Sequence, residues 1–360
     1  MQTADFDFDL PPELIAQHPS PTRGESRLLV LNRKKNRLEH KSFSNLPDFL
    51  NAGDVLVLND SRVIPARLRG TNARTGGRFE ILLLEENEPN DWWAMVRPGR
   101  SARIDTAILI SQPGATPPQS AVSAVVTKKN PEGYCRLRFS GGADIKNLLN
   151  DIGEIPLPPY IARGQTGQLA KDKERYQTVF ARNDGSVAAP TAGLHFTEAL
   201  LDKIRRSGVK VCFVTLHVGP GTFLPVKVET VSQHTMHEEQ FALGEETVRE
   251  VNEAKQRGAR VFAAGTTTVR VLESVAARNA GKLNVYEGKT NIFIFPPRHF
   301  HIVDALVTNF HLPRSTLLML ASAFAAPDET RGRERLLSAY DEAIRKRYHF
   351  YSYGDAMLIL

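Results

Sequence analysis

The spacing of apolar and polar residues divides the chain into two regions with different patterns. Between about Arg62 and Leu149, short apolar runs alternate with Gly, Pro and Asn turns, and no long helical period occurs. This pattern is typical of a small antiparallel sheet or barrel. The runs that predict its strands are Val63–Leu68, Phe79–Leu84, Trp92–Val96, Ala107–Ile110, Ala121–Val126 and Tyr134–Phe139. Gln112–Ser120, with three prolines and a glycine, is expected to be a loop tip.

After residue 151 the pattern changes to strands that alternate with helical periods. Helices are predicted at Thr197–Arg206, Glu245–Arg257, Thr267–Arg278, Ser315–Phe324 and Glu329–Arg347. Strands are predicted at Val209–Leu216, Val261–Ala264, Ile292–Phe295 and Ala305–Val307. Such alternation favours a largely parallel sheet covered by helices. The polar stretch Gly164–Lys173 is expected to be a mobile loop.

The apolar run Val55–Leu58 needs neighbouring strands, so we expect residues 1–60 to belong with the second part. The predicted fold class is therefore α/β, with a discontinuous domain formed by residues 1–60 and 151–360. Its sheet would be largely parallel and covered by helices. A small antiparallel β-barrel, residues 61–150, would be inserted into it.

Composition indicates a soluble globular protein. The chain has 360 residues, 41% hydrophobic and 24% charged, which favours two domains. No apolar run approaches the length of a membrane span, and the start of the chain lacks a signal-peptide pattern. Cys135 and Cys212 have no paired spacing, so neither a disulfide framework nor a zinc knuckle is indicated. We expect a monomer in the cytoplasm, without a membrane partner.

The charge balance favours an anionic partner. The net charge is +6, as is common among proteins that bind nucleic acid. Many basic proteins bind no nucleic acid, however, and aromatic residues make up only 8% of the chain. A non-enzymatic RNA-binding module, which usually stacks bases on aromatic side chains, is therefore a weaker alternative.

Two short segments, Ala188–Thr197 and Val214–Phe223, combine histidine, glycine and hydroxyl side chains. They supply Thr191, Gly193 and His195 from the first, and His217, Gly219, Gly221 and Thr222 from the second. Glycine lets the backbone approach a ligand, and histidine can carry a proton near neutral pH. Two ordinary turns with hydrogen-bonded histidines are the alternative, but the occurrence of both segments in one chain favours a functional site.

Other polar residues follow predicted strands. Asn59, Asp60 and Arg62 follow the first, Gly265, Thr266 and Thr267 another, and Asn309 and His311 a third. Ligands of open α/β sheets bind at the carboxyl ends of strands, so these loops and the two histidine segments are expected to form one cleft. A threonine cluster at a helix start is, by itself, usually a cap.

Several known sequence motifs are resembled in part or absent, and none is matched at the required spacing. The segment His234–Glu239, with His237, has a metal-like composition. The zincin pattern would need histidine where Phe241 stands, and no third ligand is placed by spacing, so no metal is expected. His237 and Glu239 are better interpreted as a polar pair that reaches the cleft. Gly288-Lys289-Thr290 lacks the first glycine of a P-loop. Gly-x-Ser-x-Gly and Gly-x-Gly-x-x-Gly are absent, which removes the main support for a hydrolase or a Rossmann dehydrogenase.

Long ordered motifs over nearly the whole chain resemble the S-adenosylmethionine:tRNA ribosyltransferase-isomerase family of bacterial queuosine biosynthesis. They include Gly53–Leu68, Gly185–Thr197, Thr215–Phe223, Thr308–Pro313 and Ser352–Met357. The chain departs from the family pattern at Ser61, Phe180, Pro220 and Ala326, where we expect threonine, tyrosine, alanine and glycine.

The resemblance implies transfer of the ribosyl part of S-adenosylmethionine to 7-aminomethyl-7-deazaguanine in the anticodon loop of a tRNA. The ribosyl unit would rearrange to an epoxycyclopentanediol, giving epoxyqueuosine and releasing adenine and methionine. No separate cofactor is expected, because S-adenosylmethionine is consumed as a substrate. An N-glycosidase that releases adenine without transfer is the alternative from another enzyme class.

The reaction needs a base near the acidified 5′ carbon and a proton donor for departing adenine. Candidate catalytic residues are His195, His217, Asp60, His237 and Glu239. Substrate contacts are expected from Asn59, Arg62, Thr191, Gly193, Gly219, Gly221, Thr222, Gly265, Thr266, Thr267, Asn309, His311, Tyr353 and Asp355. Which residue is the base and which the acid stays open.

Overall fold

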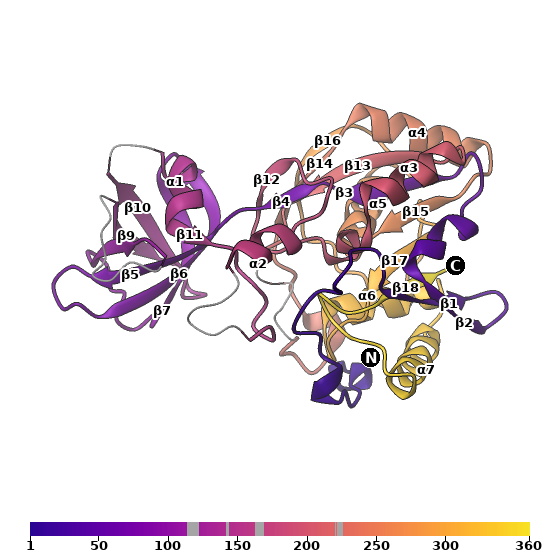
Figure 1. Cartoon of the computed structure of the whole chain (residues 1–360), viewed down its shortest axis with the longest axis horizontal. Coiled ribbons are helices and arrows are strands. Elements are labelled where there is room, and N and C mark those ends of the chain that lie inside the picture. Colours follow the sequence, from indigo (N-terminus) through magenta and orange to yellow (C-terminus); the bar gives the residue numbers. More distant parts are fainter. Residues whose placement is uncertain (114–121, 142–143, 163–168, 220, 222–225) are drawn as a thin grey trace.

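A nine-stranded sheet forms the larger part of the molecule (Figure 1). The computed structural model describes residues 1–113, 122–141, 144–162, 169–219, 221 and 226–360. The strand order is β16-β14-β13-β3-β15-β17-β18-β1-β2. The strands are β1 (Arg27–Asn32), β2 (Arg37–Ser42), β3 (Val55–Asn59), β13 (Lys210–Leu216), β14 (Glu239–Leu243), β15 (Val261–Ala264), β16 (Tyr286–Thr290), β17 (Ala305–Asn309) and β18 (Ala356–Ile359).

This sheet is mixed, so the prediction of a largely parallel sheet is only partly right. Neighbours β13–β3, β3–β15, β15–β17 and β18–β1 run parallel. The remaining neighbours, β16–β14, β14–β13, β17–β18 and β1–β2, run antiparallel. The predicted α/β sheet therefore holds for the central strands and is extended by antiparallel strands on both sides.

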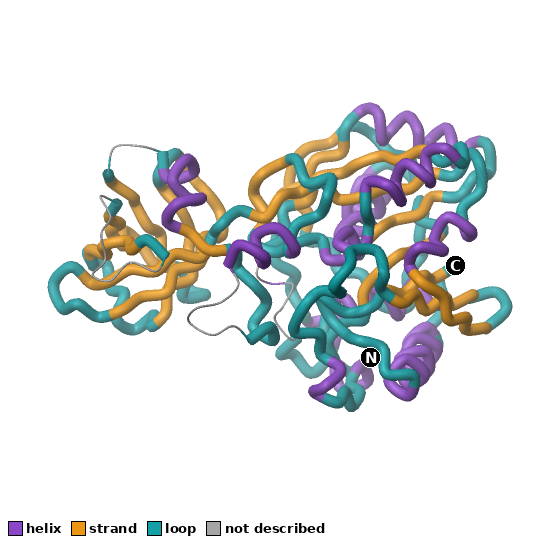
Figure 2. Tube along the Cα trace, viewed as in Figure 1, coloured by secondary structure: helices purple, strands orange, loops and turns teal. Residues whose placement is uncertain are grey.

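Helices cover both faces of the sheet (Figure 2). They are α3 (Glu198–Arg206), α4 (Glu245–Gln256), α5 (Thr266–Arg278), α6 (Thr316–Ala325) and α7 (Gly332–Arg345). Short 3-10 turns are η1 (Thr3–Phe6), η2 (Pro12–Leu14), η3 (Phe43–Phe49), η4 (Thr191–His195) and η6 (Val231–Gln233). None of the helices in the described ranges is long and apolar enough to cross a membrane.

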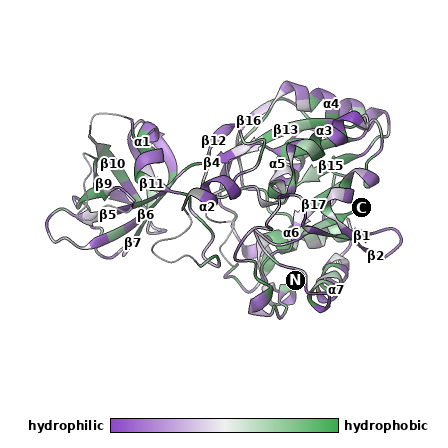
Figure 3. Cartoon of the chain, in the orientation of Figure 1, coloured by the Kyte–Doolittle hydropathy of each residue, from purple (hydrophilic) through white to green (hydrophobic). Residues whose placement is uncertain are grey.

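The central strand β3 shows why its sequence is apolar throughout. Val55 and Val57 pack in the core under α4 to α7, whereas Leu56 and Leu58 pack on the other face with η3 and α3. Successive side chains of a strand point to opposite faces, so a strand covered on both faces needs apolar residues at every position. Hydrophobic colouring accordingly concentrates in the central strands (Figure 3).

Beyond this sheet lies a closed six-stranded antiparallel barrel. Its order is β5-β6-β7-β10-β9-β8, and β8 pairs with β5 to close it. The strands are β5 (Arg67–Asn72), β6 (Arg78–Glu88), β7 (Asp91–Arg97), β8 (Ala107–Ser111), β9 (Ser123–Lys129) and β10 (Cys135–Ser140). Helix α1 (Ile145–Ile152) packs on the barrel core, and β11 (Gly153–Glu154) pairs with β5. The predicted antiparallel barrel is therefore present.

A short two-stranded ladder connects the barrel side with the sheet side. Strand β4 (Ser61–Val63) pairs with β12 (Asn183–Ser186) rather than with the barrel. The predicted strand Val63–Leu68 is thus divided between β4 and β5, with Pro65 in the gap, where a missing N–H interrupts a ladder. The domain limits at residues 60/61 and 150/151 stay a prediction.

Other expectations need correction. Ile292–Phe295 is not a strand; it is an irregular segment whose Ile294 is buried, and the neighbouring strand is β16. Helix α2 (Leu169–Arg175) occupies most of the described part of the predicted loop Gly164–Lys173, whose first residues lie outside the described ranges. The predicted loop tip Gln112–Ser120 lies almost wholly outside them too.

Candidate active site

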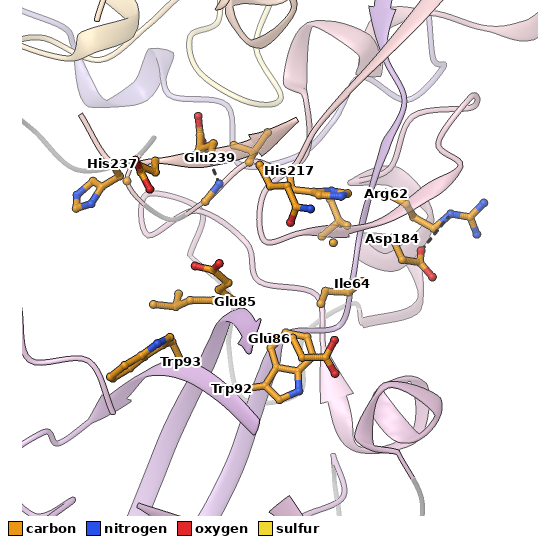
Figure 4. A pocket seen from close by; sticks show the side chains of 18 of the residues that line it. Arg62, Ile64, Glu85, Glu86, Trp92, Trp93, Asp184, His217, His237 and Glu239 are labelled. Carbon is orange, nitrogen blue, oxygen red and sulfur yellow. Dashed lines mark hydrogen bonds and ion pairs between the residues drawn. The ribbon is translucent and has the colours of Figure 1, made fainter. Parts of the chain in front are cut away.

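A cleft of about 1140 Å³ lies between the barrel and the sheet (Figure 4). Trp93 and Glu85 face it from the barrel, and His217, His237 and Glu239 face it from the sheet side. The exposed pair Lys289–Glu85 joins the two sides at 2.7 Å. Such a concave, mixed polar and apolar site between two structural units is typical of small-molecule binding.

His217 comes directly after β13 and is positioned by two buried hydroxyls. Its Nδ1 lies 2.8 Å from Ser61 Oγ, which lies 2.6 Å from Ser186 Oγ. Ser186 Oγ also accepts the N–H of Val218 at 2.9 Å. Among the described residues, Nδ1 is the only nitrogen of this ring with a hydrogen bond, which leaves Nε2 for a ligand.

The other side of the His217 ring explains a glycine. Gly185 has a φ of +150°, and a Cβ there would lie 2.7 Å from His217 Nδ1 and Cε1. Any larger residue would displace the imidazole. Gly221 plays the same part for His237, since a Cβ at Gly221 would lie 2.7 Å from His237 Cδ2.

Burial lowers the pKa of His217 below its ordinary value, and the charges of Asp60 and Asp184 oppose the shift. A neutral imidazole near pH 7 can accept a proton. Asp60 itself is buried and lies outside the residues that line the cleft. Its Oδ1 accepts hydrogen bonds from Thr215 Oγ1 at 2.7 Å and Asn183 Nδ2 at 3.1 Å. Asp60 therefore acts on His217 through its charge.

Glu239 is held in a buried ion pair with Arg270. Their side chains are 7% and 5% exposed, and Arg270 Nη1 donates to Glu239 Oε2. Glu239 Oε1 accepts the backbone N–H of Gly219 at 3.1 Å. Both carboxylate oxygens are engaged, so Glu239 orients the loop after His217. His237, by contrast, is exposed at the cleft.

A second, smaller hollow of about 40 Å³ adjoins the cleft, because Val218 and Leu317 line both. Six of the substrate contacts predicted from the sequence line this hollow: Thr191, Gly265, Thr266, Thr267, Asn309 and His311. His311 Nε2 lies 2.7 Å from Thr308 Oγ1, and burial lowers the pKa of His311 to about 3. This imidazole is neutral and fixed.

His195 lies in the core, away from the cleft. Ser26 Oγ lies 2.7 Å from its Nδ1, Asn309 Nδ2 donates to its Nε2 at 3.1 Å, and the Phe43 ring is 5.0 Å away. It is 4% exposed, and burial lowers its pKa to about 4. It borders a third small hollow, together with Tyr353. This geometry gives the predicted catalytic role of His195 no support.

Comparisons with known proteins agree along the full length. A family model described as queuosine biosynthesis protein matches residues 3–359. Proteins named S-adenosylmethionine:tRNA ribosyltransferase-isomerase from Clostridioides difficile and Thermotoga maritima are 46% identical over 359 residues and 49% identical over 360 residues. Each alignment covers 100% of both chains. The chain belongs to the S-adenosylmethionine:tRNA ribosyltransferase-isomerase family.

A solved member of the ribosyltransferase-isomerase family supports the fold. The crystal structure of S-adenosylmethionine tRNA ribosyltransferase from Thermotoga maritima is 40% identical. The match covers 99% of this chain and 100% of that one, with a TM-score of 0.55. The resemblance inferred from the motifs is thereby confirmed.

Some residues predicted as family substrate contacts have structural partners instead. Asn59 bridges β3 and β13: its Oδ1 accepts Leu216 N–H and its Nδ2 donates to Leu216 O, each at 3.0 Å. Asp355 accepts the N–H groups of Arg27 and His349, each at 2.8 Å. These two side chains hold strands and turns together.

Among the other predicted contacts, some have a structural role and some line the cleft. A Cβ at Gly193 would lie 2.7 Å from Thr178 Cγ2, so tight packing explains that glycine. Arg62 is about half exposed, lines the cleft and donates to Ala181 O at 2.7 Å. Gly219 and Gly221 also line the cleft, whereas Thr222 lies outside the described residues.

Sequence reasoning missed four members of this site. Ser61 and Ser186 orient His217 but stand 125 residues apart, so no local pattern links them. Arg270 was visible as a charge that follows a threonine cluster in the first turns of a predicted helix. Trp93 belongs to the only tryptophan pair in the chain, which was a usable signal. Among the residues that the structure describes, no three His, Cys, Asp or Glu side chains are grouped to share a metal ion.

Proposed function

We propose that this protein transfers and isomerises the ribosyl unit of S-adenosylmethionine onto the 7-aminomethyl group of 7-aminomethyl-7-deazaguanine in tRNA. The product would be epoxyqueuosine in the anticodon loop, with adenine and methionine released. The observation that carries the proposal is the full-length agreement with relatives of that name. S-adenosylmethionine is consumed, and no separate cofactor takes part.

His217 is our candidate for the base. A sulfonium acidifies the adjacent 5′ carbon, and a neutral imidazole within reach can remove its proton. The lowered pKa of His217 supports this role, as does its Nε2, which has no hydrogen-bond partner among the residues that the structure describes. The Ser61–Ser186 hydroxyls fix the ring from behind and can adjust their own hydrogens when the ring gains a proton. His237, exposed on the same cleft, is our candidate proton donor for adenine.

The cleft also supports a nucleobase substrate. Trp93 is partly exposed there, and an aromatic side chain can stack an unpaired base. The charged lining is nearly balanced between cations and carboxylates. The cations are Arg62, Lys146, Lys173, Arg270 and Lys289, and the carboxylates are Glu85, Glu86, Glu132, Asp184, Glu238 and Glu239. We therefore expect attraction for the RNA backbone to come from basic residues outside the cleft.

The deciding experiment supplies pure protein with S-adenosylmethionine and tRNA that carries the deazaguanine precursor. Mass spectrometry of the digested RNA should detect epoxyqueuosine, and adenine and methionine should appear in equal amounts. Omitting either substrate is the control. Adenine release without a change in the tRNA would favour the N-glycosidase alternative, and a methylated tRNA would contradict the proposal.

A further inference from the structure

Arg270, at the wall of the cleft, carries a hydrogen-bond donor that has no partner among the described residues. This side chain belongs to α5 and is 5% exposed. Its Nη1 donates to Glu239, and its Nε donates to Ile292 O at 3.3 Å. Its Nη2 is buried and has no partner within the described part of the chain. Arg270 nevertheless lines the cleft, so its guanidinium borders the space that a ligand would occupy.

A buried guanidinium with an unfilled donor is costly. Groups of this kind lose their hydration on burial and need an acceptor in return. Glu239 does not fill the position, because its bond to Arg270 runs through Nη1 and Nη2 is left without a partner among the described residues. A bound molecule can supply the acceptor that the described residues lack, and an anionic oxygen is the strongest partner for a guanidinium.

We propose that Arg270 Nη2 binds the carboxylate of the methionine part of S-adenosylmethionine. The inference rests on the proposed function and names a recognition site within it. A small zwitterion can enter to this depth, whereas a phosphate of the RNA backbone is carried on a bulky polymer. The choice of a carboxylate over a phosphate follows from the low exposure of Arg270.

The place of Arg270 in the cleft also fits the proposed proton removal at the 5′ carbon. Glu239 links Arg270 to Gly219, which is two residues from His217. A carboxylate held at Arg270 is connected through a short aliphatic chain to the sulfonium, and the 5′ carbon is bonded to that sulfur. Arg270 thus positions the substrate so that its 5′ carbon faces the His217 side of the cleft.

The test compares S-adenosylmethionine with its decarboxylated form, which keeps the sulfonium and nucleoside but lacks the carboxylate. The wild-type protein should prefer S-adenosylmethionine by about 100-fold in kcat/KM. Arg270→Gln should reduce this preference for S-adenosylmethionine by ~10- to 100-fold, because any loss that comes through the Glu239–Gly219 contact affects both substrates alike. An undiminished preference in Arg270→Gln would overturn the proposal. So would a raised KM for tRNA with the preference unchanged, which would indicate a phosphate contact.

Two further variants separate recognition from folding. Arg270→Gln leaves the Glu239 charge buried without its partner. The double variant Arg270→Gln/Glu239→Gln removes that charge as well. In equilibrium binding it should show the same reduced preference for S-adenosylmethionine over the decarboxylated form. Arg260→Gln is the matched control, since Arg260 pairs with Asp54 at 2.6 Å and does not line the cleft. It should lower stability and keep the full preference for S-adenosylmethionine.

The two proposals fail in different ways. If the wild-type protein binds S-adenosylmethionine but forms no epoxyqueuosine, the proposed function fails while binding still measures the Arg270 contact. If epoxyqueuosine forms and both ligands bind equally well to the wild type, the carboxylate site alone is refuted. Equilibrium dialysis with each ligand, without tRNA, supplies the binding measurements.

Discussion

The segment that carries His195 and the segment that carries His217 have nearly the same composition and entirely different surroundings. His195 has a protein partner on each ring nitrogen and an aromatic ring beside it. His217 is bonded through Nδ1 to a serine, and the rest of its ring faces the cleft. The glycines of the two segments also differ: Gly193 packs against a threonine and a phenylalanine, whereas Gly221 makes room for the imidazole of His237. The chemistry available to a histidine is thus decided by tertiary partners that neighbouring residues do not reveal.

Replacement of His217 should give the largest effect. His217→Gln should lower kcat by ~100- to 10,000-fold, the usual range for loss of a general base, while the protein stays folded. Single-turnover formation of epoxyqueuosine measures the chemical step, and thermal unfolding checks the fold. Activity within tenfold of wild type would mean that His217 is not the base.

Replacement of His195 should affect stability rather than chemistry. His195→Gln should lose ~1–3 kcal/mol of unfolding free energy at pH 8 because two buried hydrogen bonds change. The folded fraction should keep kcat within about threefold of wild type. A loss of kcat as large as that of His217→Gln, in protein shown to be fully folded, would instead restore a catalytic role to His195.

The same residue predicts acid sensitivity with a definite sign. The folded-state pKa of His195 is about 4, below the ordinary 6.5, so protonation favours the unfolded chain. Its contribution to stability is complete above about pH 6.5 and is lost as the pH falls toward 4, by roughly 3 kcal/mol in all. Chemical denaturation at several pH values should therefore show the gap between wild type and His195→Gln narrowing over this window. A constant gap would contradict the buried neutral imidazole.

Loss of the Ser61 hydroxyl should have a moderate effect. Ser61→Ala removes the partner of His217 Nδ1 and should lower kcat by ~3- to 10-fold, with little change in KM for either substrate. Ser61→Thr keeps the hydroxyl and is the matched control, with activity near wild type. Equal losses in the two variants would indicate a packing effect at this buried position.

The smallest effect should come from Asp184. Its charge raises the pKa of His217, so Asp184→Asn should move the acidic limb of the kcat/KM profile to lower pH by a few tenths of a unit. Asp184 is 71% exposed, so added salt should shrink the shift. A shift to higher pH would contradict the proposed electrostatic coupling.

Apolar patterning was enough to predict the barrel, the main helices and the central strands. In the barrel, alternating residues such as Phe79, Ile81 and Leu83 point inward, and the period of two is visible in the sequence. Strands β2 and β16 were missed because they lie at the sheet edges and are mostly polar, so they carry no such alternation. Ile292–Phe295 was misjudged because an apolar run can also be buried as an irregular segment.

The candidate site was less predictable for a different physical reason. Sequence pointed to the loop of His217 and to Glu239, since histidine, glycine and carboxylate cluster there. It could not distinguish His195 from His217, because the partners of His195 are Ser26 and Asn309, each more than a hundred residues away. The unfilled donor of Arg270 depends on where Glu239 and Ile292 place the guanidinium, which no local pattern encodes.

The place of β18 in the sheet has a consequence for how the chain folds during synthesis. Leu28–Leu31 of β1 pair in register with Ala356–Ile359 of β18, and β18 joins β1 to β17. The barrel strands lie close together along the chain and can pair soon after they emerge from the ribosome. The hairpin of β1 and β2 is synthesised early, but it can join the sheet only after β18 has been synthesised. Until then β17 presents an unpaired edge, which could pair with another chain in the interval before β18 arrives.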